Sequence, residues 1–222
     1  MHGYWKSMDV SVVYERSILY NDRMKTPIKR RMRQEIAKGA PLVRKELVQR
    51  GFRANTLSEM ATRGELLRVS RGIYISKAGT GSEFMDYELA AKVAEKGVFT
   101  LVSALRIHSL TDENPFRMTM AIPQKRHAPK TVLPIDFVYM RQNLLNMDVM
   151  EMVPGVSPIR VFTIERTIAE CFKARYKIGI EIAITALREA IRSNRVDYAK
   201  LADVLERCRM RRIVDPYLAS LI

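Results

Sequence analysis

The stretch IKRRMRQEIAKGAPLVRKELVQRGFRANTLSEMATRGELLRVSRGIYIS, residues 28–76, decides how the chain begins to fold. Its apolar residues first recur at every fourth position, at Ile28, Met32 and Ile36, which predicts a helix that ends at Gly39. A short extended piece follows, and RKELVQR then predicts a second helix of about two turns before the next glycine. The expected order so far is helix, strand, helix.

The second half of this stretch predicts a third helix and a hairpin. In RANTLSEMATRG, Asn55 or Thr56 is the expected N-cap, while Leu57 and Met60 point inward. The sequence ELLRVSRGIYIS then predicts two β-segments joined by a Ser-Arg-Gly turn. Helix, strand, helix, turn, helix and hairpin within roughly 50 residues is the order of a winged helix-turn-helix.

Positive charge is concentrated in the same region. The whole chain carries a net charge of +14. Residues 24–77 hold 14 Lys and Arg against 4 Asp and Glu, a net +10, whereas residues 81–222 hold 21 against 17, a net +4. This distribution indicates a polyanionic partner, and its overlap with the predicted winged helix favours DNA.

The third helix of such a module enters the major groove, where the edges of all four base pairs can be distinguished. Asn can pair with adenine, Arg with guanine and Glu with cytosine, while hydroxyls and cations contact phosphates. The predicted DNA-binding residues are Lys29, Arg30 and Arg33 on the first helix, Arg53, Asn55, Thr56, Ser58, Glu59, Thr62 and Arg63 on the third, and Arg68 and Arg71 on the wing. The alternative is that these are solvated faces of a basic protein, or that the module binds another protein.

The remainder of the chain predicts a second, larger domain. KAGTGS, residues 77–82, is the expected connector. Beyond it, two amphipathic helices precede three strand-like runs, RMTMAIP, IDFVYMR and SPIRVFTI, and the rest is helical, with KIGIEIAITALREAIRS expected as one helix. We therefore predict an α+β protein: an appendage over residues 1–27, a winged helix-turn-helix over 28–79, and an α/β domain with a small mixed sheet and several helices over 80–222.

Residues that could carry out catalysis are few and scattered. Cys171 lies on the apolar stripe of a predicted helix, which favours a buried thiol over a nucleophile. His108 is expected to be packed or capping, His127 exposed in a basic loop, and His2 part of the appendage. A nuclease-like acidic cluster is lacking, because Asp136 is the only carboxylate on its strands. We expect no catalytic residue, no metal site and no cofactor.

The composition also suggests a compartment. The two cysteines are too far apart in the sequence to form a disulfide framework, and the chain shows neither a signal-peptide pattern nor an apolar run of roughly 20 residues. We therefore expect reduced thiols and a cytoplasmic protein. Two further basic segments, residues 123–130 and 206–212, are either solvated or form a second contact with nucleic acid or an acidic partner.

Several segments together resemble the AbiEi family of antitoxins, which belong to type IV toxin-antitoxin systems. GELLRVSRGIYI resembles the wing of these proteins. SALRIHSLTDENP (103–115), MTMAIP (118–123) and VFTIERTIAECF (161–172), followed by IAITALREAI and PYLASL, resemble their second domain. The similarity covers roughly residues 40–222, and the joint order of these segments is more specific than any one of them.

The resemblance implies a DNA-binding transcriptional regulator of a bacterial abortive-infection system. Such an antitoxin represses its own operon by binding inverted repeats in the promoter, and its second domain counteracts a nucleotidyltransferase-like toxin, with or without direct contact. In the ERT motif, Thr163 is expected to cap a helix, Glu165 to favour its N-terminus and Arg166 to pair with a carboxylate. Position 170 departs from the family, because it is Glu where Asp is common.

Two other functions compete with this prediction. The first is a winged-helix transcription factor whose larger domain senses a ligand or a partner. The second is a nuclease or another enzyme that carries a DNA-targeting module. A neighbouring nucleotidyltransferase gene would favour the antitoxin, and metal-dependent DNA cleavage abolished by Asp136→Ala would favour the nuclease.

Overall fold

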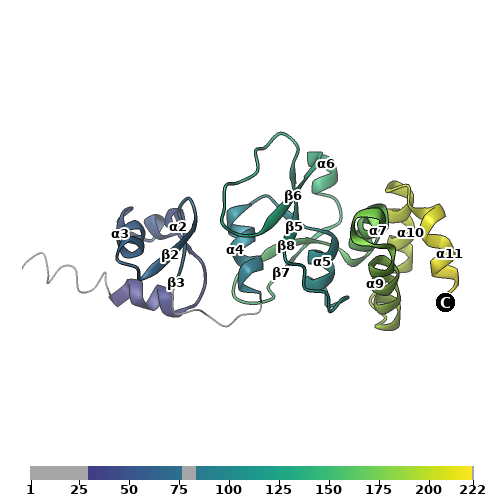
Figure 1. The fold of residues 1–222 in the computed structure, drawn as a ribbon, viewed down its shortest axis with the longest axis horizontal. Coiled ribbons are helices and arrows are strands. Elements are labelled where there is room, and N and C mark those ends of the chain that lie inside the picture. The colour runs from purple at the N-terminus through teal and green to yellow at the C-terminus, as the bar shows by residue number, and fades with distance from the viewer. Residues whose placement is uncertain (1–29, 77–83, 222) are drawn as a thin grey trace, which may run out of the picture.

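The structure, a computed structural model, describes residues 30–76 and 84–221. It is a mixed α/β protein with two small sheets, and its parts follow one another along the long axis in sequence order (Figure 1). The predicted appendage, Lys29 and the predicted connector over residues 77–82 lie outside the described residues, as does His2. No helix among the described residues combines the length and the apolar composition needed to cross a bilayer.

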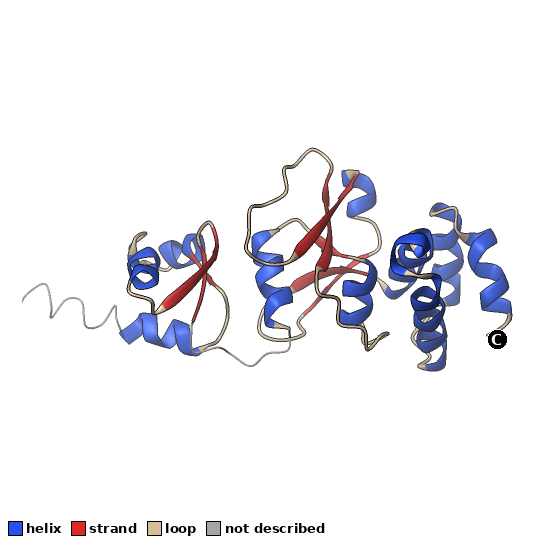
Figure 2. Cartoon of the chain, in the orientation of Figure 1, coloured by secondary structure: helices blue, strands red, loops and turns tan. Residues whose placement is uncertain are grey.

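The first part of the chain packs three helices against a three-stranded antiparallel sheet of order β1-β3-β2. Its elements are a helix over residues 30–37, β1 (Leu42–Val43), α2 (Arg44–Gln49), α3 (Thr56–Thr62), β2 (Leu66–Ser70) and β3 (Ile73–Ser76). Every helix and strand predicted for this stretch is present in the predicted order. Figure 2 shows the helices grouped around the two longer strands.

The core of this part forms from the apolar positions of the helical repeat. Met32, Leu57 and Met60 are buried as predicted, together with Leu47 and other residues of the same cluster. The predicted side-chain cap of α3 is not formed: Asn55 occupies the N-cap position, but its backbone is already helical and its side chain makes no capping bond. The first turn is instead tied by a hydroxyl inside the helix.

The second sheet has five strands in the order β6-β5-β4-β8-β7 and is mixed, as predicted. β5 runs parallel to β6 and β4 parallel to β8, while β4–β5 and β7–β8 are antiparallel. The strands are β4 (Val98–Phe99), β5 (Met118–Pro123), β6 (Ile135–Met140), β7 (Val149–Met152) and β8 (Ile159–Phe162).

Helices cover both faces of this sheet. Successive side chains of a strand point to opposite faces, and both sets include apolar residues that pack against helices. Met118, Met120 and Ile122 pack toward α4 (Met85–Val93) and α5 (Leu101–Ile107). Ala121, which lies between them in the strand, packs on the other face in a cluster that includes α6 (Gln142–Leu145). β5 is consequently apolar on both faces and occupies an interior position in the sheet.

The C-terminal quarter is a layer of helices with its own core. Its elements are α7 (Ile164–Lys173), α8 (Arg175–Ile178), α9 (Ile180–Arg192), α10 (Tyr198–Arg207) and α11 (Arg211–Ala219). α7 follows β8 directly and packs against α5, α9 and α10, so it joins the sheet to the helical layer.

The prediction of one helix over residues 177–193 is wrong. Gly179 interrupts it with φ 91° and ψ 134°, a conformation that side chains with a Cβ atom rarely adopt, and it separates α8 from α9. Three further elements, β4, β7 and α6, were not predicted, and α11 was not separated from the region expected to be helical. β4 has two residues, and β7 and α6 have four each, so each is too short to show a period.

The two sheets are bonded to each other through one short stretch of backbone. Ser70, the last residue of β2, forms a β-bridge with Thr131 in the loop between β5 and β6. The Ser70 hydroxyl donates to the Lys130 carbonyl over 2.8 Å, and the Val132 amide donates to the Val69 carbonyl over 3.3 Å. The end of the hairpin and this loop therefore hold a defined position relative to each other.

We expect Gly179→Ala to lower the free energy of unfolding by about 1–3 kcal/mol, because alanine is strained at this backbone conformation. Apart from its two chain neighbours, no described residue has an atom within 4 Å of the added methyl group, so the cost comes from the backbone and not from a clash. Urea denaturation would measure it, with Lys177→Ala as the control on an ordinary helical backbone. Equal stability of the two variants would contradict this account of the break.

Candidate nucleic-acid interface

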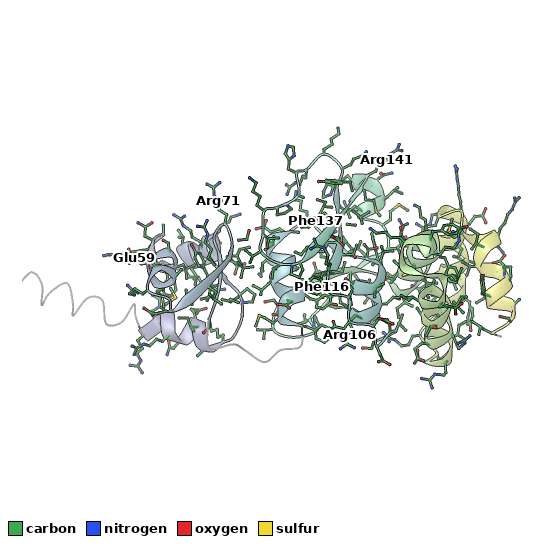
Figure 3. The ribbon with its side chains drawn as sticks, viewed as in Figure 1. Glu59, Arg71, Arg106, Phe116, Phe137 and Arg141 are labelled. Carbon is green, nitrogen blue, oxygen red and sulfur yellow. The ribbon has the colours of Figure 1, made fainter. Side chains whose placement is uncertain are left out.

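α3 has one apolar and one polar face, because its buried residues are spaced three apart. Leu57 and Met60 are buried and Ala61 packs against the same cluster, whereas Ser58, Glu59 and Thr62 are exposed. Six of the seven predicted contacts on this helix are exposed and one, Thr56, is half-buried; the exposed ones are Arg53, Asn55, Ser58, Glu59, Thr62 and Arg63. Figure 3 shows Glu59 pointing away from the body of this part.

These side chains differ in how far the protein itself already engages them. The Ser58 hydroxyl donates to the Asn55 carbonyl over 2.9 Å, and the Thr62 hydroxyl donates to the Ser58 carbonyl over 3.0 Å. Arg63 pairs with Glu65 at 2.6 Å, although both side chains are about half exposed. By contrast, Arg53, Asn55 and Glu59 make no side-chain hydrogen bond or ion pair with any described residue, so their polar groups are available to a partner.

The predicted cations on the wing and the first helix are also exposed. Arg71 lies in the turn between β2 and β3 and points outward (Figure 3), and Arg68 donates to the Ser70 carbonyl over 3.3 Å. Arg30 and Arg33 are exposed on the helix over residues 30–37. The structure thus brings cations to the hairpin, while the exposed polar face of α3 lies beside it in the same small fold.

Not every cation of the first helix is available for a partner. The Arg31 guanidinium lies 5.2 Å from the centre of the Phe52 ring and donates to the Arg50 carbonyl over 3.2 Å. Glu35 bridges Lys38 and Arg50 at 2.7 and 2.9 Å, and the hydrogen bond from Lys38 is the main reason that the pKa of Glu35 is lowered. These contacts fasten the first helix to the end of α2.

Sequence reasoning missed two cations on α2. Arg44 and Lys45 are exposed at the start of this helix, beside the hairpin turn, where the Arg44 amide donates to the Gly72 carbonyl over 2.8 Å. Two consecutive cations at the start of a helix were visible in the sequence. That they face the hairpin follows only from the packing of β1 on β3.

The residues considered for catalysis lie apart from one another and in different surroundings. Cys171 is fully buried, as predicted, and burial raises its pKa far above the ordinary range of a thiol. His108 is buried with Nε2 2.7 Å from the Phe162 carbonyl oxygen, and burial lowers its pKa. His127 is exposed, as predicted. Asp136 accepts a hydrogen bond from Arg117 over 2.7 Å.

The ERT motif builds an interior polar cluster at the start of α7. Thr163 occupies the N-cap and accepts from the Arg166 amide, as predicted. Glu165 reaches further than expected, because it accepts from the Asp197 amide over 3.1 Å and so fixes the start of α10. Arg166 lies 2.7 Å from Glu170 and 5.3 Å from the centre of the Phe162 ring, so the predicted pairing with a carboxylate is present.

The Arg166–Glu170 contact is an ion pair and not a hydrogen bond. The Glu170 oxygen that faces Arg166, Oε1, and Arg166 Nε are both buried without a hydrogen-bond partner among the described residues. Glu170, the position at which Asp is common in the resembling family, is thus the carboxylate that pairs with Arg166.

The basic segment over residues 206–212 is partly neutralised. Arg207 donates two hydrogen bonds to Asp148, both 2.9 Å, and a third to Asp203. The bonds to Asp148 are the main reason that the pKa of Arg207 is raised. Arg211 lies 3.4 Å from Asp215. Arg207 thus ties α10 to the residue before β7, and Arg211 pairs within α11, whereas residues 124–128 of the other basic segment are exposed.

Comparisons with known proteins bear on the fold alone. No protein-family model and no curated protein matches the chain. The crystal structure of the RV2827C protein from Mycobacterium tuberculosis is similar, with a TM-score of 0.54 at 12% sequence identity. The match covers 75% of this chain and 66% of that one, so this chain spans just under two thirds of the length of its structural neighbour.

We expect Arg166→Met to lower the free energy of unfolding by about 3–5 kcal/mol, because it leaves the Glu170 carboxylate buried without its cation. Arg192→Met is the matched control, since Arg192 pairs with Glu189 on the surface and exposed pairs contribute at most about 1 kcal/mol. Urea denaturation would compare the two variants. If both variants lost the same small free energy of unfolding, the buried Arg166–Glu170 pair would not stabilise α7.

Proposed function

We propose that this chain is a DNA-binding repressor that recognises its own promoter through a winged helix-turn-helix over residues 28–79. The observation that carries the proposal is the pairing of an exposed polar face on α3 with exposed arginines on the adjoining hairpin. α3 would enter the major groove, and the wing would contact the neighbouring phosphates. The order of helices and strands in this part is that of the proposed module.

The proposed role of each side chain in DNA binding follows from whether it already pairs with another residue of the protein. Arg53, Asn55 and Glu59 are available to read base edges, because no described residue pairs with their side chains. Arg63 would exchange its exposed contact with Glu65 for a base edge such as that of guanine at little cost, since an exposed ion pair contributes little. Arg30, Arg33, Arg68 and Arg71 would neutralise phosphates.

A gel-shift titration at physiological salt tests this proposal, with the upstream promoter compared with scrambled DNA of equal length. We expect wild type to prefer the promoter by at least about a hundredfold and Arg63→Ala/Arg71→Ala to lose the preference. Arg188→Ala/Arg212→Ala, which removes two exposed charges from the helical layer, is the control and keeps it. Weak, equal binding of wild type to both DNAs would contradict the proposal.

We further propose that residues 80–222 form the antitoxin domain of an AbiEi-type system and counteract a nucleotidyltransferase-like toxin. The support is the joint order of the AbiEi-like segments. In the structure two of them pack together, since His108 and Thr167 both contact the Phe162 carbonyl oxygen, at 2.7 and 3.2 Å. These two segments thus meet in the interior of this part of the chain.

Co-expression with the toxin from a neighbouring gene tests the antitoxin role. We expect the wild-type chain, produced from an unrelated promoter, to restore growth. Arg63→Ala/Arg71→Ala should restore it equally, because the proposed neutralising domain lies outside the DNA-binding module. Failure of the correctly folded wild type to restore growth would leave the alternative, a winged-helix transcription factor whose second domain senses a ligand or a partner.

A further inference from the structure

A cationic groove of about 830 Å³ lies where the hairpin of the first sheet meets the second part of the chain. One wall comes from α2, the beginning of α3 and the turn between β2 and β3. The other comes from the end of α4 and the loop after β5. Figure 1 shows this loop arching from the five-stranded sheet on the side of the first part. Ser58 of α3 lines the groove, so the groove continues the proposed interface.

The lining of this groove is strongly basic on both walls. The cationic and imidazole side chains are Arg44, Lys45, Arg68 and Arg71 from the first part and Lys92, Lys96, Arg126 and His127 from the second. Glu95 is the one carboxylate among the described lining residues. Lys92 is engaged with Glu46 at 2.9 Å, whereas no described carboxylate pairs with Arg71, Lys96 or Arg126. An anionic partner would therefore gain several unneutralised cations.

The two walls are held in place relative to each other. The bridge between Ser70 and Thr131 and the bond from Ser70 to Lys130 fix the end of the loop to the end of β2. Val69 and Ile73 of the hairpin share an apolar cluster with Leu89 of α4. The ion pair between Lys92 and Glu46 adds a third contact. Because the two walls are already fixed, a molecule that binds the hairpin also reaches the cations of the second part, and no rearrangement of the two parts is needed first.

We propose that this groove binds the sugar-phosphate backbone of double-stranded DNA beyond the segment read by α3, with Lys96 and Arg126 supplying phosphate contacts from the second domain. The inference rests on the proposed function and extends it from the winged helix to the domain behind it. A row of cations spread over several segments suits a polymer that carries one charge per nucleotide. Arg126 and Lys96 then position the duplex without reading its sequence.

The salt dependence of binding tests this inference, because each phosphate contact adds about 0.9 to the slope of log K against log salt. Fluorescence anisotropy with the full chain would give the dissociation constant for promoter and scrambled duplexes between about 50 and 200 mM salt. We expect Lys96→Gln/Arg126→Gln to reduce the slope by about 2 and to keep the preference for the promoter. Arg188→Gln/Arg212→Gln removes the same charge from the helical layer and should leave the slope unchanged.

The salt-dependence slope tests the groove as a phosphate site, and the preference for the promoter tests sequence-specific repression. An unchanged slope in Lys96→Gln/Arg126→Gln, or an equal loss in the control variant, overturns the groove as a phosphate site. A wild type that binds both duplexes equally overturns sequence-specific repression, while a slope reduced only in the groove variant still supports the groove. Circular dichroism of both variants would confirm that they fold, since all four substituted side chains are exposed.

Discussion

The junction between β8 and α7 depends on one backbone carbonyl, that of Phe162. It lies 2.7 Å from the buried His108 and accepts from the Thr167 hydroxyl, so the end of α5 and the first turn of α7 meet at the same atom. The ring of Phe162 is fully buried and lies beneath the Arg166 guanidinium. Because β8 belongs to the five-stranded sheet and α7 to the helical layer, this residue connects the two.

A second junction sets the relation between the hairpin and the domain behind it. There the contact is made by backbone groups of Val69 and Ser70 with residues 130–132, and apolar packing is limited to a small cluster. Because this junction is made mainly by backbone groups, the side chains around it remain polar. The cations on either side consequently remain exposed along a shared groove, whereas a larger apolar interface would have excluded them.

Arginines have opposite roles in different parts of the structure. Arg166 and Arg207 face carboxylates, so their charge is neutralised by ion pairs within the protein. Arg71 and Arg126 face no described carboxylate, so their charge is available to an anionic partner. Composition alone counts these arginines equally. The difference arises because the repeat of α7 sets Glu170 beside Arg166, while the fold brings Asp148 to Arg207.

The sequence by itself determined the elements whose residues repeat with a clear period, namely the three helices and hairpin of residues 30–76, the strands β5, β6 and β8, and the amphipathic helices α7 and α10. Local spacing is enough there, because burial of one face follows the helical or strand repeat. It also located the buried Cys171 and the pairing of Arg166 with a carboxylate. The tertiary structure alone decided the rest: the short strands β4 and β7 exist through their neighbours, and Lys96 and Arg126 lie beside the hairpin because Ser70 pairs with Thr131 and the hairpin packs on α4. Such contacts join residues far apart in the chain, and no local pattern records which distant backbone groups will meet.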